Sequence, residues 1–186
     1  MNENDWTKSI KNLLLSVNLG KGIKVGTLLK LLYSQEITEY DLDFKPLSQN
    51  HMDFETDLLI YEQTKRAIIP RIVIEAKLEL ISTHDAITYS HKAQNHKNVT
   101  PFLRYGIMLG NRKRHPLPGR LFRHGSNFDF MISFEKETLS KDEKRSFVKL
   151  LKQEITYSRQ FEEMLLNSRS KDRKHYSILQ KKLHLE

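Results

Sequence analysis

The first apolar residues of the chain recur at the spacing of an α-helix. They are Trp6, Ile10, Leu13, Leu14 and Val17. Glycines in the segment 18–22 can adopt positive φ and are expected to end this helix. Leucines spaced through 25–35 predict a second helix, and the alternation over 40–44 predicts a short strand that stops before Pro46.

The middle of the chain has the pattern of a β-hairpin followed by a helix. Two strongly apolar stretches, 56–62 and 70–78, predict strands, and the polar segment 63–66 predicts the turn between them. Ser82 with Asp85 three residues later is a capping-box pattern, which predicts a helix that runs to about residue 97.

The remaining chain predicts two further strands, over 103–109 and 127–134. A second capping box at 140–143 predicts a long helix, and a last helical piece is expected over 172–183. This order of elements indicates an α/β fold with a central mixed four- to five-stranded sheet flanked by helices. With no linker or repeat, we expect one domain over 1–186, with helical N-terminal (1–36) and C-terminal (139–184) elements.

Charged residues interrupt the apolar hairpin at two positions that face each other. If Asp57 lies opposite Glu75, the centre of the hairpin falls at Arg66, inside the predicted turn. Alternate residues of a strand share a face, so Glu75 and Lys77 project together while Ala76 points to the opposite face. The sequence therefore predicts two carboxylates and an ammonium on one patch of an apolar sheet.

Such a patch needs a physical reason, because unpaired charge near the centre of a sheet is costly. Two carboxylates suit a hard cation such as Mg²⁺, which can polarise a phosphodiester and lower the pKa of bound water. An adjacent lysine can position water or neutralise developing charge. The alternative is a structural Glu75–Lys77 pair, with Asp57 at the end of the other strand.

These residues resemble the PD-(D/E)XK nuclease superfamily, which includes most type II restriction endonucleases. The resemblance rests on Glu-Thr-Asp-Leu-Leu-Ile at 55–60 and Ile-Val-Ile-Glu-Ala-Lys-Leu at 72–78, and extends loosely over 83–109. It implies that Asp57 and Glu75 bind Mg²⁺ and that Lys77 is the catalytic lysine. Thr56 stands where the motif has its proline, a residue that many such enzymes lack.

Many members of this superfamily add an acidic residue from a helix that precedes the first core strand. Glu36 and Glu39 are the candidates here, with an exposed charge at a helix end as the alternative interpretation. Glu55 is a third candidate.

Composition and net charge limit the kinds of metal site, the location and the partners that we expect for this protein. The 186 residues include no cysteine, which excludes disulfides and thiolate metal sites, and the histidines lack zinc-site spacing. No apolar run is long enough to cross a membrane, and an acidic start unlike a signal peptide favours the cytoplasm. A net charge of +8 favours contact with phosphates. The residues expected to bind DNA are Lys92, Gln94, Lys97, Arg112, Lys113, Arg114, Arg120 and Arg123.

We expect a Mg²⁺-dependent endonuclease that hydrolyses double-stranded DNA, similar to a type II restriction enzyme. A homodimer is expected if both strands of a palindrome are cut. Two alternatives remain open at this point. One is a repair, recombination or transposon-associated nuclease with the same fold, and the other is a catalytically inactive DNA-binding module.

Overall fold

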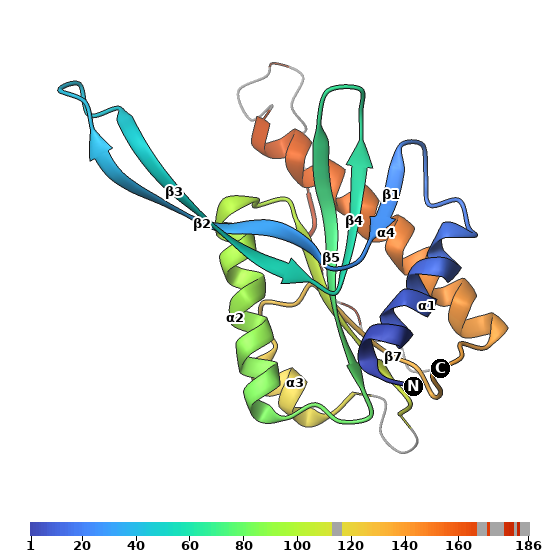
Figure 1. Cartoon of the computed structure of the whole chain (residues 1–186). Coiled ribbons are helices and arrows are strands. Elements are labelled where there is room, and N and C mark those ends of the chain that lie inside the picture. The colour runs from blue at the N-terminus through green and yellow to red at the C-terminus, as the bar shows by residue number, and fades with distance from the viewer. Residues whose placement is uncertain (113–116, 167–170, 172–176, 181, 183–186) are drawn as a thin grey trace.

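A five-stranded mixed sheet with strand order β1-β4-β5-β6-β7 forms the centre of the molecule (Figure 1). The structure is a computed structural model that describes residues 1–112, 117–166, 171, 177–180 and 182. The strands are β1 (Ile23–Gly26), β4 (Leu58–Gln63), β5 (Ile68–Leu78), β6 (Arg104–Gly110) and β7 (Phe130–Ser133). The pairs β1–β4 and β4–β5 are antiparallel, whereas β5–β6 and β6–β7 are parallel. The predicted α/β fold class is confirmed.

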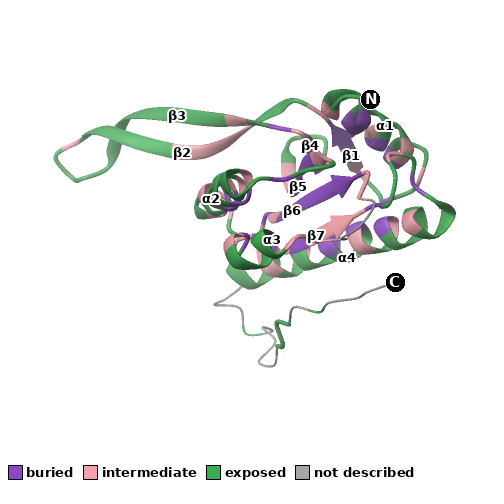
Figure 2. Ribbon diagram, turned by 90° about the horizontal axis from the view of Figure 1, so that it is seen from below, coloured by how far each residue is buried: buried purple, intermediate pink, exposed green. Residues whose placement is uncertain are grey.

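Successive residues of a strand point to opposite faces of the sheet, and here both sets are largely apolar. Helices therefore cover both faces. On one face, Ile72 and Ile74 pack with α1 (Glu3–Leu15) and α4 (Lys141–Leu166). On the other face, Val73 packs with α2 (Thr83–Val99) and α3 (Gly119–His124). Figure 2 shows the buried strands between the two helical layers.

The helix α2 connects the parallel strands β5 and β6, which a short hairpin turn cannot join. Its start agrees with the sequence pattern, because Ser82 and Asp85 form a complete capping box. Glu143 likewise bonds back to the backbone amide of Ser140 at 2.8 Å, at the start of α4. The strands and helices predicted between 56 and 166 are therefore confirmed within a few residues.

Two arginines of the sheet hold α4 in place. Arg71 contacts Glu62 at 2.9 Å and Glu162 of α4 at 2.6 Å. Arg104 contacts Glu154 of α4 at 2.6 Å and Asp129 at 3.0 Å. These ion pairs fix α4 against the face of the sheet that α1 also covers.

The prediction for residues 25–44 is wrong. Instead of a helix and a short strand, the chain forms β1 and then β2 (Leu29–Tyr40), which pairs with β3 (Pro46–Thr56) in a separate two-stranded sheet. This long hairpin, here called the arm (residues 29–56), projects from the body of the protein (Figures 1 and 2). The N-terminal segment, residues 1–36, is thus helical only over α1 among its described elements.

Long-range pairing explains the difference. Tyr33 of β2 stacks on Phe54 of β3 with ring centroids 3.7 Å apart, a contact that local leucine spacing cannot reveal. The segment predicted to be a strand is the tip of the arm, where the Asp41 carboxylate accepts hydrogen bonds from the amides of Asp43 at 2.9 Å and Lys45 at 2.8 Å. Pro46 begins β3 rather than ending a strand.

The last predicted helix, 172–183, falls largely outside the described residues. Among the helices that the structure describes, none combines the length and the apolar character needed to cross a membrane.

Candidate active site

The β4–β5 hairpin brings Asp57 and Glu75 to adjacent positions. Leu58 pairs with Ile74 at the end of the ladder, so Asp57 lies one residue beyond this pair, opposite Glu75. The tight turn spans 64–67, with the Thr64 amide bonded to the Ala67 carbonyl at 2.9 Å. A register shift between Ile60 and Tyr61 reconciles this turn with the pairing. The predicted register and turn are confirmed.

Hydrogen bonds fix the corner of the chain that presents Asp57. The buried Thr56 hydroxyl donates to the Leu29 carbonyl at 2.8 Å, where the related motif has a proline. Asp57 Oδ2 accepts from the Ala76 amide at 2.8 Å, which ties the carboxylate to β5. The hydrogen bond of Thr56 thus stabilises the bend of the chain before Asp57. A proline at this position would restrain the same bend through its ring.

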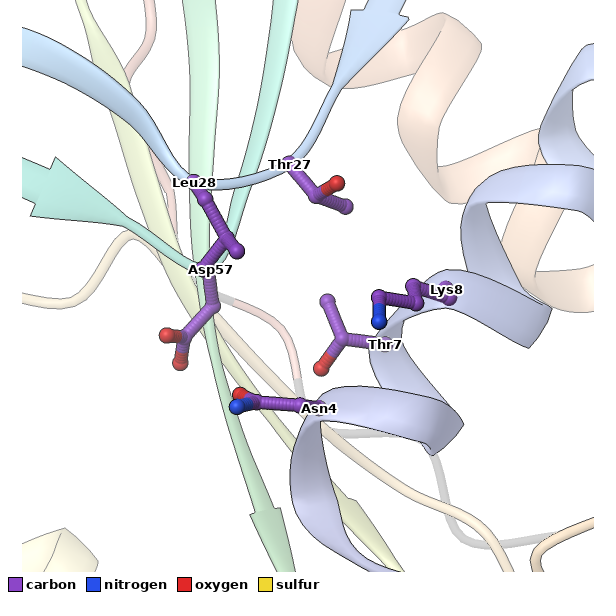
Figure 3. A pocket seen from close by; sticks show the side chains of 6 residues that line it. All are labelled: Asn4, Thr7, Lys8, Thr27, Leu28 and Asp57. Atoms are coloured by element: carbon purple, nitrogen blue, oxygen red, sulfur yellow. The ribbon is translucent and has the colours of Figure 1, made fainter.

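Asp57 also borders a small hollow between the sheet and α1. Asn4, Thr7 and Lys8 of α1 line its other side, together with Thr27 and Leu28 (Figure 3). Its volume is about 10 Å³, room for roughly one water molecule. Asp57 itself is half-buried, so this end of the sheet is partly open to solvent.

Glu75 is the most deeply buried acid of the site, with 1% of its side chain exposed. Its Oε1 lies 2.9 Å from the Lys92 ammonium of α2 and accepts a hydrogen bond from the Tyr105 hydroxyl of β6. Burial raises the pKa of Glu75, the nearby Lys92 opposes this rise, and the charge of Asp57 adds to it. The register of the hairpin, which places Asp57 opposite Glu75, explains why the charge of Asp57 acts on this pKa.

Lys77 follows Glu75 on the same face of β5, as predicted. Its ammonium binds Glu3 of α1 at 3.0 Å and lies 5.3 Å from the ring centroid of Tyr89. Burial opposes the charge of Lys77, but the Tyr89 hydroxyl and the Glu3 carboxylate outweigh burial and raise its pKa. Lys77 is therefore a protonated ammonium at neutral pH, able to donate hydrogen bonds but not to accept a proton.

The donor set suits a magnesium ion rather than zinc. Asp57 Oδ2 accepts from the Ala76 amide, and Glu75 Oε1 contacts Tyr105 and Lys92, so each carboxylate has a second oxygen that could bind a cation. Mg²⁺ binds through one or two carboxylates and keeps several of its waters. No group of three or more His, Cys, Asp or Glu that could hold a metal occurs among the described residues. Asp57 and Glu75 are thus the residues that could hold a hard cation such as Mg²⁺, whereas a structural zinc site uses four ligands.

The structure does not bring the additional acids to this site. Glu36 and Glu39 lie on the exposed outer part of β2, opposite Asn50 and Ser48, and not on a helix. Glu55 contributes its backbone carbonyl, which accepts from Lys92 at 2.8 Å, while its side chain is exposed. The acid that does reach the site from a preceding helix is Glu3.

Sequence reasoning missed Glu3 because its position resembles an ordinary helix start. Acidic residues are common in a first turn, where they complement the helix dipole. Burial of Trp6 against the core fixes α1, and Glu3 then reaches both Lys77 and the amide of Leu78 at 3.3 Å. The available signal was an acid three residues before the first buried residue of that helix.

The residues expected to bind DNA occupy varied positions. Lys92 contacts Glu75, and Lys97 contacts Asp129 at 2.8 Å. Gln94 is exposed and bonds Asn98 at 2.8 Å. Arg112 and Arg120 donate to the carbonyls of Glu79 and Ile81, in the loop that follows Lys77. Arg123 lies on α3, and Lys113 and Arg114 fall outside the described residues. The described part of the basic stretch thus lies beside the loop after β5, on the α2 side of the sheet.

An aromatic cluster joins the arm to this side of the sheet. The fully buried His96 of α2 lies 5.8 Å from Phe54 and 5.6 Å from Tyr105, measured between ring centroids. Its Nδ1 bonds the Leu32 carbonyl at 3.0 Å. Nε2 has no hydrogen-bond partner in the part of the chain that the structure describes. Burial lowers the pKa of His96 to about 4, so the ring is neutral at physiological pH.

Comparisons with known proteins give a distant structural relative. No protein-family model and no curated protein matches the sequence. A similar solved structure is that of the restriction endonuclease BsaWI in a pre-specific complex with DNA. The two chains are 14% identical, with a TM-score of 0.46 over 90% of this chain. This chain spans 64% of the length of that one, and the likeness concerns the fold alone.

Proposed function

We propose that this protein is a Mg²⁺-dependent endonuclease that hydrolyses phosphodiester bonds of double-stranded DNA, of the type II restriction endonuclease kind. The observation that carries the proposal is the convergence of Asp57, Glu75 and Lys77 at the end of the β4–β5 hairpin. Lys92 compensates the charge of Glu75, whereas no ion pair of Asp57 occurs among the described residues, so the second carboxylate favours binding of a further cation and argues for a functional site rather than a structural pair.

Each residue has a distinct task in this proposal. Asp57 and Glu75 hold the metal ion, which when bound supplies a Lewis acid for the phosphate and lowers the pKa of a bound water. Lys77 remains protonated beside Glu3 and Tyr89. It orients the attacking water and balances the negative charge that develops on the phosphate. Glu3 acts as a positioning residue for Lys77.

The charge of the chain supports DNA as the substrate. The net charge is +8, and a positive protein concentrates polyanions near its surface. Cleavage of both strands at a symmetric sequence requires two such sites, so we propose that the active species is a homodimer.

The test is incubation of supercoiled plasmid DNA with the protein and Mg²⁺, with the same reaction in EDTA as a control. Asp57→Ala and Glu75→Ala should abolish cleavage and weaken Mg²⁺ binding, yet leave DNA binding without metal intact or stronger, because negative charge is removed. Lys77→Ala should abolish cleavage while Mg²⁺ still binds. Glu163→Ala and Lys21→Ala, both at exposed positions, are the matched controls and should cleave normally.

Mapping the DNA ends separates the alternatives. Discrete fragments support a restriction-type enzyme, and a preference for branched DNA supports a repair or recombination nuclease. DNA binding with no cleavage in any divalent metal would identify a catalytically inactive DNA-binding module. Cleavage by folded Glu75→Ala at the wild-type rate would refute the site.

A further inference from the structure

The arm exposes a set of large apolar side chains far from the candidate active site. Leu42 and Phe44 at its tip are 101% and 84% exposed, and Leu47 is 65% exposed. Tyr40 and Ile37 are exposed nearby. Apolar groups grouped in this way on a projecting element mark an interaction surface rather than ordinary solvent-facing positions.

The charge of the arm identifies the kind of partner. Residues 29–56 contain six acidic residues and two lysines, in a chain that is otherwise strongly basic. The outer part carries Glu36, Glu39, Asp41 and Asp43. This acidic surface repels DNA phosphates, so the ligand of the arm is a basic protein surface. Arm-to-arm pairing is also disfavoured, because the like charges would face each other.

A matching basic surface lies on the first half of α4. Its exposed cationic side chains follow one another at helical spacing, accompanied by a single exposed acid, Asp142. They are Lys141, Lys144, Arg145, Lys149 and Lys152, here called the basic stripe. The helix packs through Phe147 and Leu151 on the sheet face opposite α2, so the stripe points away from the candidate active site.

The dimensions of the two surfaces agree. The stripe from Lys141 to Lys152 is about 17 Å long at 1.5 Å per helical residue. The acidic strand segment from Glu36 to Tyr40 is about 13 Å long, and the tip extends it. The arm cannot fold back onto its own α4, because Tyr33, Phe54 and His96 fix its base beside α2 and it projects outward (Figure 1).

We infer that the arm docks onto the basic stripe of a second copy of this chain. In a symmetric pair each arm reaches α4 of the other subunit, with the acidic residues facing the stripe and the tip residues Leu42 and Phe44 packing beside it. The inference rests on the proposed homodimer and names the surface that forms it. The inferred interface can be wrong while the proposed nuclease activity is right, because sedimentation measures association of the subunits and plasmid cleavage measures the chemistry.

The test is analytical ultracentrifugation of the full chain and of two charge-reversal variants. One variant carries Glu36→Lys and Glu39→Lys in the arm, and the other carries Lys149→Glu and Lys152→Glu in the stripe. Each should raise the dissociation constant of the dimer at least about tenfold, because like charges then meet across the interface. Lys21→Glu with Lys24→Glu, which changes the net charge by the same amount as the stripe variant at exposed positions off the stripe, should leave the dimer intact.

Mixing the two reversal variants gives the sharpest result. The basic arm of one then faces the acidic stripe of the other, and the second interface is complementary too, so the mixture should dimerise although neither variant does. Salt at about 0.5 M should weaken the wild-type dimer through screening. A monomeric wild-type protein at low salt, or a mixture that stays monomeric, would overturn the inference. Dimers that persist in both single variants would also overturn it.

Discussion

Lys92 compensates the buried charge of Glu75, and its replacement tests the electrostatics of the site directly. Its ammonium lies 2.9 Å from Glu75 Oε1 and 2.8 Å from the Glu55 carbonyl. In Lys92→Met the aliphatic stem is kept while the charge is lost. Glu75, with a side chain 1% exposed, then keeps the Tyr105 hydroxyl but no cation at that distance.

The expected loss of stability is large. Removing one partner of a buried ion pair costs about 3 kcal/mol or more. For a domain of this length, that corresponds to a decrease in melting temperature of about 6–12 °C. Part of the penalty is avoided by protonation of Glu75, which makes the loss depend on pH.

The direction of this dependence follows from the pKa of Glu75, which burial already raises. Without Lys92 it rises further, so folded Glu75 holds its proton to a higher pH than unfolded Glu75. The stability that Lys92→Met gains from protonated Glu75 is then fully present below the pKa of Glu75 in the unfolded chain. It is lost as the pH rises through the pKa of Glu75 in the folded protein. The deficit of Lys92→Met should therefore be largest near pH 8 and smallest near pH 5.

Urea unfolding at these two pH values measures the effect, with Lys21→Met as the exposed control. Adding Glu75→Gln to Lys92→Met should recover most of the loss at pH 8, because no buried charge remains. Mg²⁺ should stabilise Lys92→Met more than the wild type if Glu75 is a metal ligand. A deficit that is equal at both pH values, or absent, would refute the electrostatic explanation.

Two further predictions concern neighbouring residues. Glu3→Gln should slow cleavage about 10- to 100-fold and shift the alkaline limb of the pH–rate profile to lower pH, because the carboxylate helps raise the pKa of Lys77. An unchanged profile would show that Glu3 does not position Lys77. His96 has a folded pKa of about 4, below its unfolded value, so it contributes stability that is lost as pH falls. Between pH 7 and 5 this loss is about 2 kcal/mol. His96→Phe should remove that slope in urea titrations, and an equally steep slope in the variant would contradict the assignment.

The sequence by itself determined the elements whose information is local. Capping boxes at 82–85 and 140–143 marked the starts of α2 and α4, and strongly apolar stretches on either side of a polar turn marked β4 and β5. The turn between these strands set their register to within one residue, and the register shift between Ile60 and Tyr61 then brought Asp57 opposite Glu75. Register is readable in a short hairpin because few residues separate the partners.

The tertiary structure decided the features that depend on distant partners. The leucines of 29–32 suit a helix or a strand, and pairing with a segment about twenty-five residues later made them part of the arm. Glu3 met Lys77 because burial of Trp6 docked α1 at the end of the sheet. Lys92 was expected to bind DNA, but its ammonium faces Glu75 instead. A buried carboxylate is costly unless a cation pairs with it, and the packing of α2 brings Lys92 to that position. The spacing of residues along one strand or helix shows which side chains share a face of that element. The contacts between different elements form only after the helices have packed on the sheet.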